Sequence, residues 1–110
     1  VSLVANGDFE SRYRVLQENN LDKLFTKTIF TQSDKDGSYE ATILDLGLEP
    51  SEVAVVDDRM VRGIRWGNRR GATTIWFKNG RFAEELPTAE TGEPTHIITN
   101  LVELKEIFGY

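Results

Sequence analysis

The stretch Val53-Ala54-Val55-Val56-Asp57-Asp58-Arg59 decides the fold of this chain. Its first four residues form a continuous apolar run, which is typical of a parallel strand covered on both faces. Two adjacent carboxylates end the run, and a helical segment, residues 60–70, follows as far as Gly71. Glycine is favoured just past the end of a helix, where φ is positive. We therefore predict a buried strand that leads directly into a helix.

The same alternation of strand and helix extends in both directions from this stretch. Apolar, β-rich runs predict strands, and apolar residues at helical spacing predict helices. The predicted strands are residues 1–5, 28–31, 53–56, 73–77 and, at an edge, 96–99; the predicted helices are residues 9–17, 38–46, 60–70 and 101–107. Such alternation implies right-handed βαβ units. We predict an α/β fold, with a Rossmann-like parallel sheet and helices on both faces.

The helices should supply much of the core. Side chains expected to face the sheet are Phe9, Tyr13 and Leu16 in the first helix, and Tyr39, Ile43 and Leu46 in the second. Asp8 and Ser38 are predicted to cap these two helices, because their oxygens can accept from free backbone N–H groups. We expect Trp66 and Trp76 to be packing residues.

Composition bounds the class of protein. The chain has 110 residues, the size of one domain, and we see no linker that divides residues 1–110. Its net charge of −5 disfavours non-specific binding to nucleic acid or anionic membrane. It contains no cysteine, which fits a reducing cytoplasm, and its apolar runs are far shorter than a membrane span. We predict a cytoplasmic protein that binds neither nucleic acid nor membrane.

Two predicted strands end in polar residues that suit a ligand site. The first strand ends in Asn6-Gly7-Asp8, and the third ends in Asp57-Asp58. Ligands of open parallel sheets bind at the carboxyl ends of strands, where helix N-termini also attract anions. Paired carboxylates there suit Mg²⁺ together with a phosphate, because Mg²⁺ needs only one or two carboxylates. The alternative, which the residues support about equally, is that these acids only cap helices.

The other polar residues have simpler interpretations. Five arginines surround one predicted helix: Arg59, Arg62, Arg65, Arg69 and Arg70. They could form a patch for phosphate, RNA or an acidic partner, but in this acidic chain a solvated helix face is the better interpretation. His96, the single histidine, has no partner at a spacing that would suggest a catalytic triad.

With these residues in place, the chain resembles the C-terminal part of the haloacid dehalogenase-like (HAD) phosphohydrolase superfamily. The run Val53–Arg59, followed by Arg62-Gly63-Ile64 and then residues 67–74, resembles the fourth motif of that family. Leu3-Val4-Ala5-Asn6-Gly7 is similar to its second motif, and the connector 46–53 also looks typical. The resemblance implies an incomplete HAD-like core and a Mg²⁺-dependent phosphohydrolase that acts on a phosphorylated small molecule.

The chain departs from the family pattern at four points. The first motif, which carries the nucleophilic aspartate, has no match here, so the resemblance assigns no catalytic residue. The hydroxyl of the second motif falls at Ala5, and the second acid of the fourth motif falls at Gly63. The lysine of the third motif matches at best Lys35, for which a solvated surface position is the better interpretation.

What remains of the implied site is small. Asp58 matches the main metal ligand of the fourth motif, and Asp57 is a second metal candidate. The implied phosphate contacts are Asn6, Gly7 and Lys35. Two functions stay open: part of a Mg²⁺-dependent phosphohydrolase, inactive as this chain alone, or a non-catalytic descendant used for association.

The implied partners follow from the first strand. The chain opens without methionine inside a predicted strand, so we expect upstream sequence, and an enzyme would need the first motif to lie there. In the family, the strand of that motif lies between the strands predicted here at 1–5 and 53–56. Either these two strands pair directly into a contiguous sheet, or another chain supplies a strand. We favour association, as a homo-oligomer or with the missing N-terminal segment.

Overall fold

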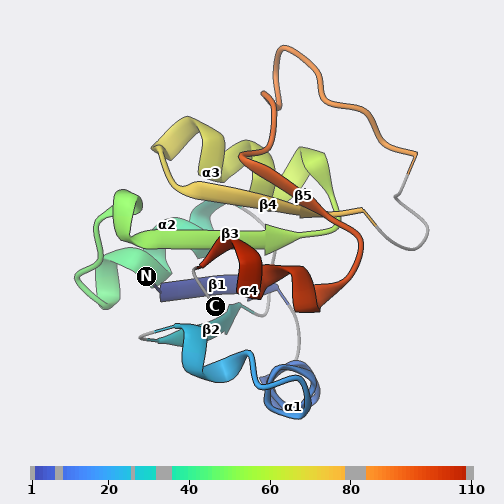
Figure 1. Cartoon of the computed structure of the whole chain (residues 1–110). Coiled ribbons are helices and arrows are strands. Elements are labelled where there is room, and N and C mark those ends of the chain that lie inside the picture. The colour runs from blue at the N-terminus through green and yellow to red at the C-terminus, as the bar shows by residue number, and fades with distance from the viewer. Residues whose placement is uncertain (1, 7–8, 26, 32–35, 79–83, 109–110) are drawn as a thin grey trace.

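A single parallel sheet organises the chain. A computed structural model describes residues 2–6, 9–25, 27–31, 36–78 and 84–108. Within these residues five strands pair in the order β2-β1-β3-β4-β5, and each neighbouring pair is parallel (Figure 1). The strands are β1 (Ser2–Asn6), β2 (Thr28–Thr31), β3 (Val53–Asp57), β4 (Thr73–Phe77) and β5 (His96–Ile98). The predicted α/β fold with a parallel sheet is confirmed.

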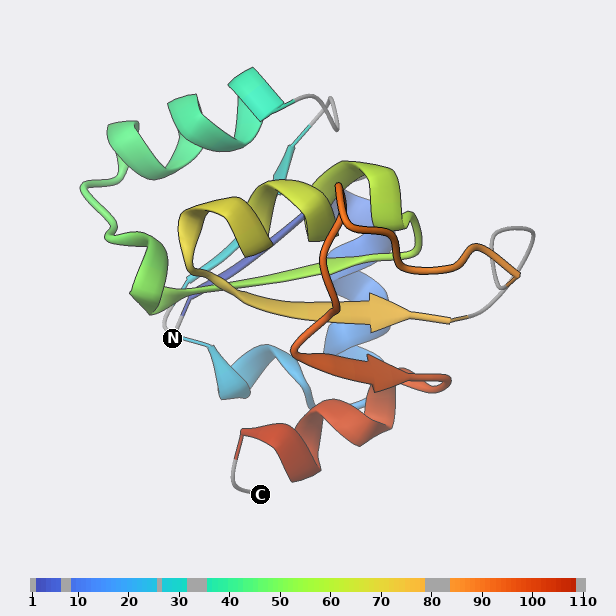
Figure 2. The ribbon, with the colours of Figure 1, turned by 90° about the horizontal axis from the view of Figure 1, so that it is seen from above.

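Helices cover both faces of the sheet, as predicted. The α-helices are α1 (Phe9–Glu18), α2 (Asp36–Asp45), α3 (Arg65–Arg70) and α4 (Leu104–Ile107). Short helical turns join them: η1 (Asp22–Leu24), η2 (Pro50–Glu52), η3 (Met60–Ile64) and η5 (Leu101–Glu103). Seen from above, α2 and α3 lie on one side of the sheet and α4 lies on the other (Figure 2), where Leu16 of α1 and Leu104 of α4 join the same apolar cluster. No helix in the described segments is long and apolar enough to cross a membrane.

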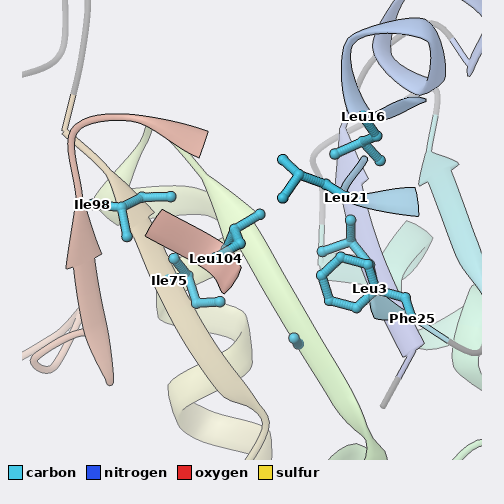
Figure 3. Close-up of a cluster of buried hydrophobic side chains, with 8 residues drawn as sticks. Leu3, Leu16, Leu21, Phe25, Ile75, Ile98 and Leu104 are labelled. Atoms are coloured by element: carbon cyan, nitrogen blue, oxygen red, sulfur yellow. The ribbon is translucent and has the colours of Figure 1, made fainter. Parts of the chain in front are cut away.

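In the described residues the core has one larger apolar cluster on each face of the sheet and a smaller cluster of Met60, Ile64 and Trp76. The cluster beneath α1 and α4 contains Leu3, Leu16, Leu21, Phe25, Ala54, Ile75, Ile98 and Leu104 (Figure 3). The cluster beneath α2 and α3 contains Val4, Tyr39, Ile43, Val53, Val55, Trp66 and Ala72. Neighbouring residues of β1 and β3 enter opposite clusters because successive strand side chains point to opposite faces. The continuous apolar run of β3 is therefore buried on both sides.

The two strands β1 and β3 pair directly with each other. Their register places Ser2 opposite Val53 and Val4 opposite Val55. The contiguous sheet, one of the two arrangements expected from the sequence, is thus the one observed. Direct pairing satisfies the backbone groups along both strands, which would otherwise form two exposed edges. Association with another polypeptide stays a prediction.

Helix α2 differs from the prediction at both ends. It begins at Asp36, so Ser38 lies inside the helix rather than capping it, and its carbonyl accepts from the Thr42 hydroxyl at 2.8 Å. The helix begins two residues before Ser38, so the Ser38 side chain lies too far along it to accept from its first N–H groups. Leu46 lies beyond the helix and is 37% exposed, so its predicted core role is wrong. Leu48, after the turn, packs against the core instead.

The other helix predictions have mixed outcomes. Leu16 is buried, as predicted, whereas Asp8 and the side chains of Phe9 and Tyr13 lie outside what the structure describes. The predicted helix 60–70 divides into η3 and α3, because the backbone at Arg62 has φ −118° and ψ −111°, which is not helical. Gly71 ends α3 with φ +82°, as expected for a glycine in this position.

Candidate functional site

A buried carboxylate organises the end of β3. Asp57 is only 9% exposed, and one of its oxygens, Oδ1, accepts from the backbone N–H of Arg59 at 3.0 Å. Its other oxygen, Oδ2, accepts from the N–H of Gly63 at 2.8 Å and lies 3.5 Å from the Tyr39 hydroxyl of α2, which donates to it. The side chain therefore closes the turn between β3 and α3, and we call residues Asp57–Gly63 the acidic corner.

The surroundings of Asp57 make its negative charge costly. Burial raises the pKa of this carboxyl to about 6, against the opposing effect of the Arg59 and Gly63 amides. The neighbouring carboxylate of Asp58 raises the pKa further, by a hydrogen bond and by like-charge repulsion. A cation beside the acidic corner would relieve this cost.

Asp58 is held by its backbone while its side chain is exposed. The indole Nε1 of Trp76 in β4 donates to the Asp58 carbonyl oxygen at 3.0 Å. Trp76 is 2% exposed and packs with Met60 and Ile64, so the donor sits on a rigid support. The predicted packing role of Trp76 is confirmed, and the same residue also anchors the peptide that presents the Asp58 carboxylate to solvent.

Gly63 has no room for a side chain. A Cβ atom at this position would lie 2.6 Å from Oδ2 of Asp57, 2.9 Å from the Tyr39 hydroxyl and 2.9 Å from Cγ1 of Val55. The amide of Gly63 approaches the buried carboxylate so closely because nothing separates them. The acid that the family pattern places here could not be accommodated without moving the acidic corner.

A third carboxylate reaches the acidic corner from the connection between β4 and β5. Oε1 of Glu85 accepts from the backbone N–H groups of Met60 and Val61, the latter at 3.2 Å. Oε2 accepts from the Arg59 guanidinium Nε at 3.1 Å. Glu85 is not among the predicted site residues, because it lies 26 positions after Arg59 in a polar stretch without a recognisable motif.

The predicted site residues are only partly described. Asp57 and Asp58 lie together at the carboxyl end of β3. Asn6 ends β1, and since Ala5 is paired with Val56, its backbone lies at the same edge of the sheet. Gly7 and Lys35 fall outside the described residues. No group of three or more acidic or histidine side chains in the described ranges is arranged to hold a metal.

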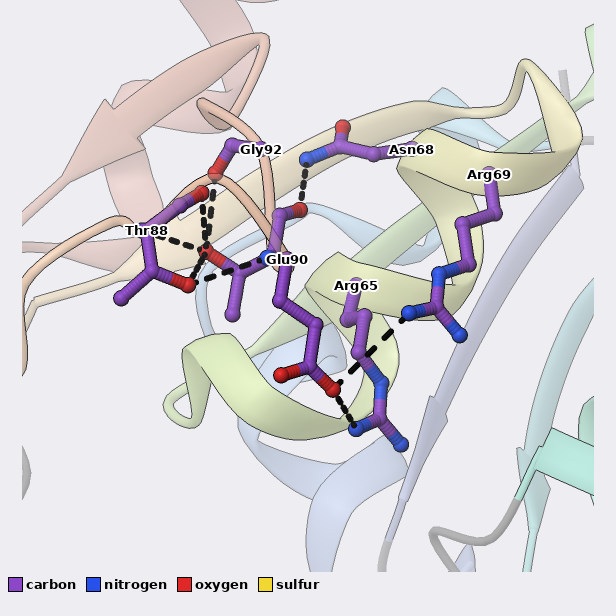
Figure 4. A network of polar contacts seen from close by, with 7 residues as sticks. Arg65, Asn68, Arg69, Thr88, Glu90 and Gly92 are labelled. Atoms are coloured by element: carbon purple, nitrogen blue, oxygen red, sulfur yellow. Dashed lines mark hydrogen bonds and ion pairs between the residues drawn. The ribbon is translucent and has the colours of Figure 1, made fainter.

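The arginines of α3 have carboxylate partners within the chain. Glu90 lies 3.3 Å from the Arg65 guanidinium and 3.9 Å from that of Arg69 (Figure 4). Arg70 pairs with Glu40 of α2 at 2.7 Å. These ion pairs fit the interpretation of this surface as a solvated helix face, and the absence of nucleic-acid binding stays a prediction.

A parallel α/β sheet with acids at the end of a central strand defines a class of fold with its ligand site at the strand ends. The chain belongs to the HAD-hydrolase-like family, whose model matches residues 35–104. The resemblance noted in the sequence is thereby confirmed. No curated protein matches the chain.

Solved structures of the same class share the fold. One is the magnesium-bound HAD-hydrolase YfnB from Bacillus subtilis, with a TM-score of 0.60, 19% identity and coverage of 99% of this chain and 49% of that chain. A HAD phosphatase from Thermococcus onnurineus has a TM-score of 0.55 and 24% identity, and the match covers 98% of this chain and 49% of that chain. A predicted phosphoglycolate phosphatase from Haemophilus somnus 129pt has a TM-score of 0.57 and 19% identity, with coverage of 96% of this chain and 48% of that chain. The chain spans about half the length of these structures.

Proposed function

We propose that this chain is the metal-binding part of a Mg²⁺-dependent HAD-like phosphohydrolase, and that alone it does not turn over phosphate esters. The observation that carries the proposal is the exposed Asp58 carboxylate, held by its backbone beside buried Asp57. Family membership supports it, as does the magnesium bound to YfnB, although that ion is a property of YfnB. The substrate would be a phosphorylated small molecule, and the protein would be cytoplasmic.

The two carboxylates fit a hard cation in different ways. Asp58 offers oxygens to solvent, and Mg²⁺ binds through one or two carboxylates while keeping several waters. Asp57 already accepts from two amides and a hydroxyl, so we assign it to hold the turn and to add negative charge. Bound Mg²⁺ would neutralise the charge of a phosphoryl group. The residues proposed to contact that phosphate remain Asn6, Gly7 and Lys35.

The first test uses Mn²⁺, a paramagnetic substitute for Mg²⁺. We expect Mn²⁺ to broaden the NMR signals of the Asp58 and Arg59 amides first. Asp58→Asn should weaken binding about tenfold or more, because it removes the charged ligand. Asp45→Asn is the matched control: this exposed aspartate lies at the end of α2, and its loss should leave binding unchanged. Broadening that starts elsewhere, or survives Asp58→Asn, would contradict the assignment.

A second candidate function is a non-catalytic domain for protein association. The tight packing around Gly63 favours it, because the acid expected there cannot fit. A generic aryl phosphate assay with Mg²⁺, performed on a longer protein that includes the first motif, separates the two functions. Turnover that Asp58→Asn abolishes would establish the enzyme. If neither the longer protein nor its Asp58→Asn variant hydrolyses the aryl phosphate, the association domain is favoured.

A further inference from the structure

The segment between β4 and β5 is fastened to the face of the molecule that carries η3 and α3. The Asn68 amide donates to the Thr91 carbonyl at 2.8 Å (Figure 4), and its oxygen accepts from the Thr74 hydroxyl at 2.8 Å. Thr95 completes the attachment, because its N–H donates to the Thr74 hydroxyl oxygen at 2.9 Å and its own hydroxyl accepts from the N–H of Thr74 at 3.0 Å. Together with the Glu90 ion pairs, these contacts place the segment independently of Glu85.

The turn that Glu85 contacts needs acceptors from outside itself. The first N–H groups of a helical turn have no partner within that turn, and the non-helical backbone at Arg62 shortens η3 further. The Glu85 carboxylate supplies the acceptor for Met60 and Val61 and draws Arg59 to the same place. Because the Glu85 side chain is only 19% exposed, these charge-assisted hydrogen bonds are stronger than the same bonds would be in water.

We infer that Glu85 is a positioning residue that fixes the Asp58–Val61 turn and thereby the direction of the Asp58 carboxylate. Two side chains then hold this turn: the Trp76 indole of β4 donates to the Asp58 carbonyl, and the Glu85 carboxylate accepts from the next amides, Met60 and Val61. Asp57 closes the far end of the acidic corner through Gly63. The consequence for metal binding rests on the proposed function of Asp58, whereas the fixing of the turn does not.

The test compares Glu85→Ala, Glu85→Gln and the control Glu84→Gln, which removes the exposed neighbouring charge. Hydrogen exchange without metal reports the turn: Glu85→Ala should lower protection of the Met60 and Val61 amides about tenfold, as expected for a lost bond to a charged acceptor. Glu85→Gln should retain most of this protection, because its carbonyl oxygen can still accept. Unchanged protection in Glu85→Ala would overturn the inference.

Mn²⁺ titration of the same proteins reports the consequence. Glu85→Ala should weaken Mn²⁺ binding about tenfold, a typical effect of losing a residue that orients a metal ligand. Glu85→Gln should bind nearly as well as the unmodified chain, and so should Glu84→Gln. Equal weakening in the Ala and Gln variants would mean that only charge matters, and would overturn positioning. If the unmodified chain binds no Mn²⁺ at Asp58, the proposed function fails, while the exchange result still decides the role of Glu85 in the turn.

Discussion

Replacement of Gly63 by alanine should lower the free energy of unfolding by roughly 2–3 kcal/mol, the usual cost of overpacking a well-filled core. The added methyl group would lie 2.6 Å from the Asp57 carboxylate and 2.9 Å from both the Tyr39 hydroxyl and Val55. The backbone of Gly63 is not in the left-handed region, so the cost comes from these contacts and not from φ. Urea denaturation at neutral pH measures it.

Gly37→Ala is the matched control for this substitution. Gly37 lies in α2, and a Cβ there would meet no atom within 4 Å. Alanine is the better helix former, so this variant should change stability by less than about 1 kcal/mol, in the stabilising direction. A Gly63→Ala protein as stable as Gly37→Ala would show that the acidic corner can relax, and that steric exclusion does not explain the glycine.

Much of the sheet could be predicted because its signals are local. The apolar run before Asp57 is long enough to mark a buried strand, and β2 was predicted with its observed bounds of Thr28–Thr31. Gly71 marked the end of α3 because the left-handed conformation there favours glycine. The pairing of β1 with β3 was one of two open arrangements, because pairing depends on which other strands are present.

The details of the acidic corner were less predictable because they depend on residues distant in the sequence. Asp57 and Asp58 could be singled out from their place after β3, but their different burial could not. That difference arises because the carboxylate of Asp57 turns inward to the amide of Gly63. The contribution of Glu85 depends on how the β4–β5 connection folds back, and no local pattern encodes that path. Hydrogen bonds of this kind emerge only once the sheet is assembled.

The stability of the chain should fall as the pH rises from 4.5 to 7, and Asp57 should be a main cause. Its pKa is raised from 3.8 to about 6 in the folded chain, so the folded state binds this proton more tightly than the unfolded state. The stabilisation is therefore complete below pH 3.8 and is lost as the pH rises through about 6. At about 1.4 kcal/mol per tenfold change in proton affinity, the whole effect is roughly 3 kcal/mol, of which about 2 kcal/mol falls above pH 4.5.

Urea denaturation of Asp57→Asn across this pH range isolates the effect, because asparagine does not ionise. The free energy of unfolding of the unmodified chain, minus that of the variant, should decrease by about 2 kcal/mol from pH 4.5 to 7. Asp58→Asn should keep most of the pH dependence, since burial contributes more to the raised pKa of Asp57 than the neighbouring carboxylate does. Glu103, whose pKa is lowered from 4.5, titrates alike in both proteins, so its contribution cancels in this difference. A difference that stays constant or increases with pH would mean that folding does not raise the pKa of Asp57, and that its amide donors outweigh its burial.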